Sequence, residues 1–389
     1  MLMTAQTVQD LESRHVLPTY KRANVVFERG EGAYLIDRDG RRYLDFVSGV
    51  GVAALGHARA SLVRALADQA AALAHTSNLY YHPLQADLAS RLAAHSGLDR
   101  AFFCNSGTEA VEACLKFARR ANPGRPRIVA LKHSFHGRTL GSLSVTWEPS
   151  YREPFGPLVE QVVFADPTDP ASIDAAITGD TAAVIVEPIQ GEGGVRPLSA
   201  AAVDAINAAS ARTGALVIAD EVQSGMGRTG RMFHSPAAGL KPDLMALGKA
   251  LGGGMPIGAA LVSERVALHV SAGDHGSTYG GNLLACRAAL TVLDELDGGL
   301  LARARAAGAY LGAALDVLQV RHARIVDVRG AGLMCGIEID GDAAAVVGAA
   351  LDRGLLINRT AGSVLRLLPP FIVTDQQIDL AISILDDVL

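Results

Sequence analysis

Three segments of the sequence place a reactive or anion-binding side chain directly after a short apolar run. Lys249 lies in ALGKALGGG, where a desolvated lysine has a lowered pKa and can form a Schiff base. Asp220 closes the run LVIAD, where a carboxylate could pair with a pyridine ring nitrogen, with Mg²⁺ or with a structural cation. Ser106, Gly107 and Thr108 open an amphipathic stretch, so their N–H groups and hydroxyls could cradle a phosphate.

Each of these segments also has a purely structural interpretation. Ser106 and Glu109 have the spacing of a capping box, and most loop lysines are simply solvated. Chemistry is favoured at Lys249 because only five of the 35 basic residues are lysines and because its flanks are apolar and rich in glycine. A nucleotide-binding P-loop is excluded, since Asp243 replaces its first glycine and Ala250 follows the lysine.

Two further segments suit a planar, acidic ligand. Phe135, in FHGRT, could stack on a flat cofactor, although ordinary core packing is an equal alternative. Arg138 could fork onto a carboxylate. Arg366 lies in the apolar run VLRLL, where a guanidinium needs a buried partner, and a substrate carboxylate or a nearby glutamate would serve.

Other classes of ligand and location are poorly supported. A net charge of −5 gives no general attraction for nucleic acid or an anionic membrane, and no apolar run reaches the ~20 residues of a membrane span. Residues 1–10 contain no apolar core of signal-peptide length. The eleven histidines show no metal-ligand spacing, and the four cysteines form no CxxC pair, which is typical of a reduced cytoplasmic protein.

The elements that must position these side chains indicate an α/β domain with a mainly parallel sheet. In such sheets ligands bind at the carboxyl ends of the strands, where the candidate residues lie. The predicted strands are Ala101–Cys104, Arg127–Leu131, Gln161–Phe164, Ala182–Glu187, Ala215–Asp220 and Leu244–Leu247, with helices at Gly107–Arg120 and Ser199–Thr213.

The remainder of the chain predicts a smaller α+β domain. A hairpin is expected around Arg38-Asp39-Gly40, between Tyr34–Asp37 and Arg41–Asp45. After residue 281 the patterns predict helices at Leu283–Leu296, Leu301–Val317, Asp342–Arg353 and Asp375–Val388, and strands at Ile325–Val328, Gly332–Ile339 and Val364–Leu367. The length of 389 residues suits two domains.

The candidate residues occur in one order and in segments that identify a family. The chain resembles the class III, or ω-amino, aminotransferases, and is most similar to their acetylornithine-specific members. The segments are NSGTEAVEACLKFAR, FHGRT, EPIQGEGG, ADEVQSGMGRTG, PDLMALGKALGGGMPIGA, HGSTYGGN and LRLLPP. The resemblance implies the fold type I of pyridoxal-phosphate (PLP) enzymes, with an N-terminal segment at 1–50 that joins the small domain, a PLP-binding domain at 51–281 and a small domain at 282–389.

The resemblance also implies a role for each residue. Lys249 binds PLP and moves the proton, while Asp220 pairs with the pyridine nitrogen. Other residues that the resemblance places on the cofactor are Ser106, Gly107 and Thr108 on the phosphate, Val222 and Phe135 on the ring faces, Gln223 near the phenolic oxygen, and Thr278 from the second subunit of a homodimer. Substrate contacts are implied for Arg138, Ser277 and Arg366, and Glu187 can neutralise Arg366 when the other substrate is present.

The implied reaction moves the distal amino group of N2-acetyl-L-ornithine to 2-oxoglutarate, a step in arginine biosynthesis. Val50 stands where ornithine aminotransferases have a tyrosine that holds the free α-amino group, and a valine tolerates an acylated nitrogen. Val50 could also be simple loop packing. Succinylornithine, ornithine, 4-aminobutyrate and lysine derivatives remain alternative donors, and a non-catalytic binding module is the alternative of a different class.

Overall fold

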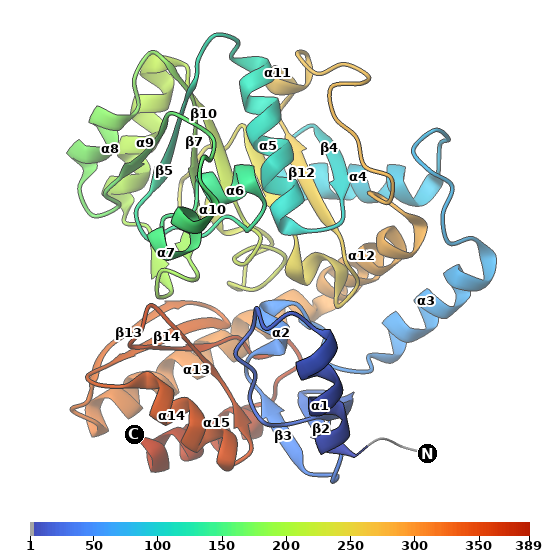
Figure 1. Cartoon of the computed structure of the whole chain (residues 1–389), viewed down its shortest axis with the longest axis vertical. Helices are drawn as coiled ribbons and strands as arrows, with labels where there is room; N and C mark the ends of the chain where they lie inside the picture. Colours follow the sequence, from blue (N-terminus) through green and yellow to red (C-terminus); the bar gives the residue numbers. More distant parts are fainter. Residues whose placement is uncertain (1–3) are drawn as a thin grey trace.

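A seven-stranded sheet forms the centre of the larger part of the molecule (Figure 1). The computed structural model describes residues 4–389, so the first three residues of the expected N-terminal segment lie outside it. Every strand runs parallel except β12, which is antiparallel to both of its neighbours. In spatial order the strands are β4 (Arg100–Cys104), β12 (Gly258–Val262), β11 (Leu244–Leu247), β10 (Leu216–Asp220), β7 (Thr181–Val186), β5 (Arg127–Leu131) and β6 (Val162–Ala165).

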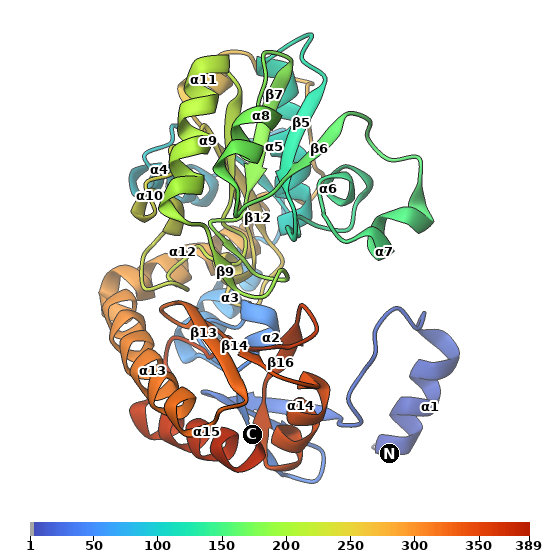
Figure 2. The same ribbon diagram turned by 90° about the vertical axis from the view of Figure 1, so that its left-hand side faces the viewer.

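Helices cover both faces of this sheet, which explains why its strands are continuous apolar runs. All residues of β7, β10, β11 and β12 are buried. One face packs on α5 (Gly107–Ala121), and the other packs on α8 (Pro170–Ala176) and α9 (Ala200–Thr213), as Figure 2 shows. The six strands and two helices predicted in this region are confirmed, with ends that differ by one residue at most.

A smaller α+β unit lies beside the large one. Its antiparallel sheet has the order β13 (Ile325–Ala331), β14 (Met334–Ile339), β17 (Val364–Leu367) and β16 (Asn358–Thr360). Its helices are α13 (Leu301–Arg321), α14 (Ala343–Asp352) and α15 (Asp375–Val388). The N-terminal strands β1 (Phe27–Glu31), β2 (Tyr34–Asp37) and β3 (Arg42–Asp45) join this unit, because β3 pairs in parallel with β15 (Leu355–Leu356).

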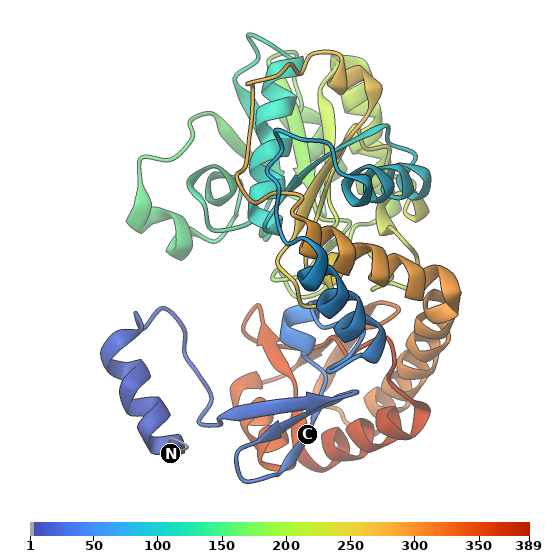
Figure 3. The same cartoon turned by 90° about the vertical axis from the view of Figure 1, so that its right-hand side faces the viewer.

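Three helices before the first strand of the large sheet were not predicted. They are α1 (Ala5–His15), α3 (Ala60–Ala72) and α4 (Pro83–Ser96). The first of these has no buried residue and stands apart from the rest of the chain (Figure 3). Helix α12 (Leu283–Glu295) and a π-helical turn (Leu296–Leu300) lead from the large unit into α13. None of the helices in residues 4–389 is both long and apolar enough to cross a bilayer.

The remaining elements are short. They are α2 (Ser48–Gly51), α6 (Leu140–Ser144), α7 (Pro149–Arg152), a 3₁₀ turn (Glu153–Phe155), β8 (Ile189–Gln190), β9 (Arg196–Pro197), α10 (His234–Ala237), a 3₁₀ turn (Lys249–Gly252) and α11 (Glu264–Ala267). The segment from Met245 to Val262 is therefore strand, turn and strand.

Candidate active site

The three segments that could do chemistry meet at one edge of the large sheet. Asp220 ends β10, Lys249 follows β11, and the start of α5 follows β4. The backbones touch at this edge, since a Cβ added to Gly248 would lie 3.0 Å from Cα of Gly107. Burial lowers the pKa of Lys249 below its usual value, which favours the neutral amine that attacks a carbonyl.

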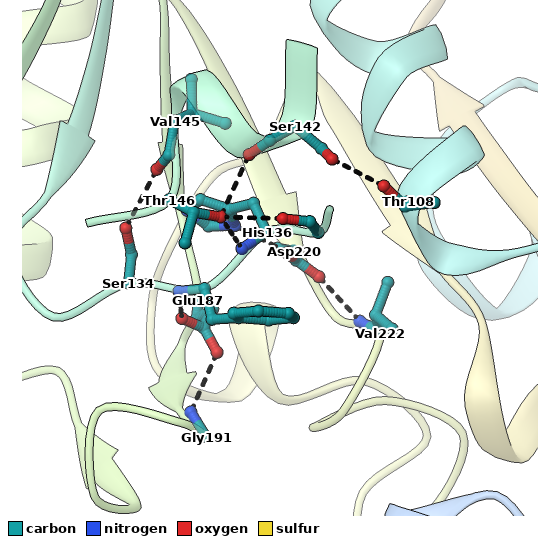
Figure 4. A network of polar contacts seen from close by, with 12 residues as sticks. Thr108, Ser134, His136, Ser142, Val145, Thr146, Glu187, Gly191, Asp220 and Val222 are labelled. Carbon is teal, nitrogen blue, oxygen red and sulfur yellow. Dashed lines mark hydrogen bonds and ion pairs between the residues drawn. The ribbon is translucent and has the colours of Figure 1, made fainter. Parts of the chain in front are cut away.

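A histidine fixes the carboxylate of Asp220. Nδ1 of His136 lies 2.7 Å from Oδ2 of Asp220, and both side chains are buried (Figure 4). The backbone N–H of Val222 donates to Oδ1 of the same carboxylate at 3.0 Å. Because an ionised carboxylate only accepts, His136 carries its proton on Nδ1, and the imidazole orients Asp220 toward the site.

The carboxylate of Glu187 accepts hydrogen bonds from backbone N–H groups and makes no ion pair with an arginine of the described residues. It accepts from the N–H of Phe135 at 2.8 Å through Oε1 and from the N–H of Gly191 at 2.9 Å through Oε2 (Figure 4). Burial raises the pKa of Glu187 to about 7, and the nearby charge of Asp220 acts in the same direction. Glu187 therefore positions the segment that carries the ring of Phe135.

The expected pairing of Glu187 with Arg366 is wrong in this structure, because Glu192 occupies that position. Nη1 of Arg366 lies 2.5 Å from Oε1 of Glu192 and 3.2 Å from Oε1 of Gln223. The guanidinium is buried, whereas the carboxylate of Glu192 is about one-third exposed at 36%. Both glutamates belong to the segment EPIQGE, and the tight turn after β7 sends the first inward and the second toward β17.

The start of α5 leaves hydrogen-bond donors free. Oγ of Ser106 accepts from the N–H of Glu109 at 3.3 Å, which is half of the expected capping box. The other half is absent, since Glu109 instead accepts from the N–H of Asn105 at 2.9 Å. In residues 4–389 the N–H groups of Gly107 and Thr108 have no acceptor, so this helix start can bind an anion.

The remaining predicted residues lie around this edge at different depths. Val222 contacts Gly107 so closely that a Cβ there would lie 2.6 Å from Cγ1 of the valine. Oγ of Ser277 accepts from the side chain of Asn105 at 3.2 Å. Thr278 and Arg138 are exposed, and the guanidinium of Arg138 lies over the ring of Tyr151 at 4.1 Å from its centroid. Within residues 4–389, neither Arg138 nor Thr278 forms a hydrogen bond or ion pair with Lys249 or Asp220.

Val50 adopts a conformation that is strained for its side-chain type. The backbone of α2 is a left-handed turn, with φ of 50° at Ser48, 61° at Gly49, 63° at Val50 and 83° at Gly51. Left-handed φ is rare for a β-branched residue and costs of order 1–3 kcal/mol. Oδ1 of Asp45 holds the turn by accepting from the N–H of Val47 at 2.9 Å and of Ser48 at 2.7 Å.

A cavity of about 580 Å³ opens next to Glu192 between the two units. Phe135, Trp147 and Tyr151 line it from the large unit, and residues 359–362 line it from the small one. It is large enough for an amino-acid-sized ligand. The carboxylate of Glu192 lies at this cavity, so a ligand inside could approach the ion pair with Arg366.

Comparison with known proteins decides the family. The model of the class III aminotransferases matches residues 17–389. The chain belongs to the class III aminotransferases. Acetylornithine aminotransferases from Archaeoglobus fulgidus and Gloeobacter violaceus are each 46% identical to it, over 96% and 98% of this chain and 98% and 97% of their own. A crystal structure of ornithine aminotransferase from Toxoplasma gondii superposes with a TM-score of 0.95 at 31% identity, covering 100% of this chain and 95% of its own.

Class III aminotransferases depend on PLP, and this chain is therefore a PLP-dependent transaminase of fold type I. The geometry fits that cofactor at three points. The anion-binding start of α5 suits the phosphate, and the Asp220 carboxylate suits a protonated ring nitrogen. The amine of Lys249, which has no hydrogen-bond partner in residues 4–389, suits the aldehyde carbon.

Two residues of this site had no assigned role in the sequence. His136 was visible only as a member of FHGRT, and nothing in the sequence paired it with Asp220, 84 residues later. Glu192 was visible in EPIQGEGG, but the resemblance assigned the pairing with Arg366 to Glu187, the other glutamate of that segment. A buried strand that ends in an aspartate does predict a polar partner, and His136 is that partner.

Proposed function

We propose that this transaminase moves the distal amino group of N2-acetyl-L-ornithine to 2-oxoglutarate, giving N-acetyl-L-glutamate 5-semialdehyde and L-glutamate. The observation that carries the proposal is the 46% identity to acetylornithine aminotransferases over nearly the whole of both chains. This reaction would be a step of arginine biosynthesis. The four cysteines are free and buried, which supports a reducing, cytoplasmic location.

The residues would divide the chemistry between them. Bound PLP supplies a ring that withdraws electrons from the carbon that loses its proton. Asp220, held by His136, would keep the ring nitrogen protonated, and the amine of Lys249 would carry the proton from one carbon to the other. Ser106, Gly107 and Thr108 would hold the phosphate, while Phe135 and Val222 would contact the two faces of the ring. Gln223 would approach the phenolic oxygen from its position beside Arg366.

Arg366 and Glu192 would form the switch between the two substrates. Glutamate brings an α-carboxylate to Arg366, whereas the distal end of the donor brings only methylene groups. An unpaired buried guanidinium costs several kcal/mol, so Glu192 should close on Arg366 when the donor is bound. The 2.5 Å ion pair is the closed arrangement. At the other end, Arg138 would bind the donor's α-carboxylate and Ser277 would assist.

The active unit would be a homodimer in which Thr278 completes the partner's phosphate site. The surface around Thr278 supports this, since Tyr279 is 64% exposed and Leu79 and Tyr80 are 83% and 69% exposed. Side chains of this kind gather where another chain covers them. We retain 1–50, 51–281 and 282–389 as proposed domain boundaries, and the pairing of β3 with β15 supports the association of the first with the last.

The choice of donor is tested by comparing kcat/KM for N-acetylornithine, succinylornithine, ornithine and 4-aminobutyrate, with 2-oxoglutarate as the acceptor. N-acetylornithine should give the highest value. A value for ornithine or 4-aminobutyrate at or above it would overturn this donor and leave the transaminase assignment intact. Val50→Tyr introduces a hydroxyl that could accept from the free α-amino group of ornithine. This variant should therefore show a lower preference for the acylated donor over ornithine.

A further inference from the structure

A cluster of three hydroxyl groups, those of Thr108, Thr139 and Ser142, lies beside the start of α5; Thr108 is partly exposed and Thr139 is exposed. Oγ1 of Thr108 lies 2.6 Å from Oγ of Ser142 and 3.0 Å from Oγ1 of Thr139. The last two oxygens are 2.9 Å apart. Ser142 is fully buried on α6, and Figure 4 shows its hydroxyl pointing at that of Thr108.

A carboxylate holds the far side of this cluster in place. Oε1 of Glu112 accepts from the hydroxyl of Thr139 at 2.5 Å, from the N–H of Gly141 at 2.9 Å and from the N–H of Ser142 at 3.1 Å. Since a carboxylate oxygen only accepts, the one hydroxyl proton of Thr139 is donated to Glu112. Thr139 can therefore accept from the other hydroxyls but cannot donate to Thr108.

Two glycines allow the cluster to close. A Cβ on Gly137 would lie 2.2 Å from Oγ1 of Thr108 and 2.5 Å from Oγ of Ser142. A Cβ on Gly141 would lie 2.1 Å from Oε2 of Glu112. The chain thus keeps both positions free of side chains where α6 and the loop before it pack on α5, and the hydroxyl contacts depend on that packing.

We propose that Ser142 is a positioning residue for the cofactor phosphate, which donates its hydroxyl proton to Thr108 so that Thr108 donates its own outward. A threonine has one hydroxyl proton, and that proton is free for an anion only when the hydroxyl 2.6 Å away donates to Thr108 instead of accepting from it. Thr139 cannot be that neighbour, because its proton is held by Glu112. Ser142 is the nearest hydroxyl and has its proton available, with the carbonyl oxygen of Thr139 at 3.2 Å as its alternative acceptor. The inference rests on the proposed contact of Thr108 with the phosphate.

The test measures the dissociation constants of the apoenzyme for PLP and for pyridoxal, which lacks the phosphate. Ser142→Ala should weaken PLP binding roughly 5- to 10-fold and change pyridoxal binding less than about twofold. Ser142→Cys, which keeps the volume and is a weak donor, should shift PLP in the same direction. Ser144→Ala is the matched control, because Ser144 is buried on the same helix and its hydroxyl donates to the carbonyl of Leu140 instead.

A double-mutant comparison separates this role from general damage to the loop. In a Thr108→Val background the additional loss from Ser142→Ala should disappear, since Ser142 acts only through Thr108. Equal weakening of PLP and pyridoxal by Ser142→Ala, or an undiminished loss in the Thr108→Val background, would overturn the proposal. If Thr108→Val itself left PLP affinity unchanged, the phosphate contact of Thr108 would be wrong and this inference with it. Neither result depends on which amine is the donor.

Discussion

The cofactor side and the substrate side of this site are built in different ways. On the cofactor side, Asp220, Lys249 and the start of α5 all follow strands of one sheet, and two of these strands, β10 and β11, are fully buried. On the substrate side, the turn at Val50, the loop at Glu192 and β17 with Arg366 come from three distant parts of the chain. One side rests on a single sheet, and under the proposed switch the other would change partners between two substrates.

This difference explains why the residues of the cofactor side were easier to predict from the sequence than those of the substrate side. Residues at the carboxyl ends of parallel strands are brought together by the sheet itself, so a pattern of strands is enough to group them. A side chain that crosses from one unit to another has no such rule. The grouping of residues by strand ends does not apply to the partner of Arg366. Glu187 and Glu192 are five residues apart, and only Glu192 contacts Arg366.

Lys249 should give the largest effect, since its amine is buried at the sheet edge near the carboxylate of Asp220. Lys249→Ala is expected to lower the rate of the glutamate half-reaction by about 10⁴-fold or more, because the group that holds the carbonyl and moves the proton is lost. The half-reaction is followed by the change in cofactor absorbance. Lys241→Ala, which alters an exposed lysine, should turn over normally. Normal turnover of Lys249→Ala would refute its role.

The pair of Asp220 and His136 should show graded effects on the same side. Asp220→Asn is expected to lower kcat by about 10²- to 10³-fold, since an amide cannot hold the pyridine nitrogen protonated. His136→Asn should cost only about 10-fold, because it disturbs the orientation of Asp220 without removing the charge. Rapid-mixing kinetics of both half-reactions would measure this. A greater loss from His136→Asn than from Asp220→Asn would contradict the proposed order of roles.

The sequence predicted more of the fold than of the site. Apolar runs located the buried strands because both faces of the sheet are covered, as in Val184 and Ile218. Strand β12 was not among the predicted strands, and an apolar run carries no information on whether its neighbours are parallel. The left-handed turn at Val50 could not be predicted either. A valine argues against positive φ, and the bonds from Asp45 that hold the turn form only in the folded chain.

Glu192 tests the substrate side. Glu192→Gln is expected to raise KM for the ω-amino donor about 10-fold, because the buried guanidinium of Arg366 then faces methylene groups without a charged partner. The glutamate half-reaction should change much less, since the substrate carboxylate replaces Glu192. Single-turnover measurements of each half-reaction separate the two. Glu187→Gln, which removes no contact with Arg366, should affect both half-reactions to a similar degree. Equal effects of Glu192→Gln on both would count against the switch.

The smallest predicted effect concerns the pH dependence of the apoprotein's stability. Burial raises the pKa of Glu187 from 4.5 to about 7 in the folded chain. Between these values the folded protein holds a proton that the unfolded chain has released. The stabilisation is therefore complete below the unfolded pKa and is lost as the pH rises through about 7. Between pH 5 and pH 8 the Tm of the wild-type apoprotein should fall by about 2 °C more than that of Glu187→Gln.

In a plot of Tm against pH, the constant difference between wild type and Glu187→Gln and the difference in their slopes have different causes. The glutamine cannot accept from both the N–H of Phe135 and the N–H of Gly191, so Glu187→Gln should lower Tm by an amount that does not vary with pH. Only the slope reports the titration. Glu192→Gln is the matched control, because the Arg366 guanidinium outweighs the effect of burial and lowers the pKa of Glu192. The contribution of Glu192 is lost only as the pH falls through a value below its usual range, so its replacement should leave the slope between pH 5 and pH 8 unchanged. A scanning-fluorimetry series in which Glu187→Gln kept the wild-type slope would show that another group titrates there.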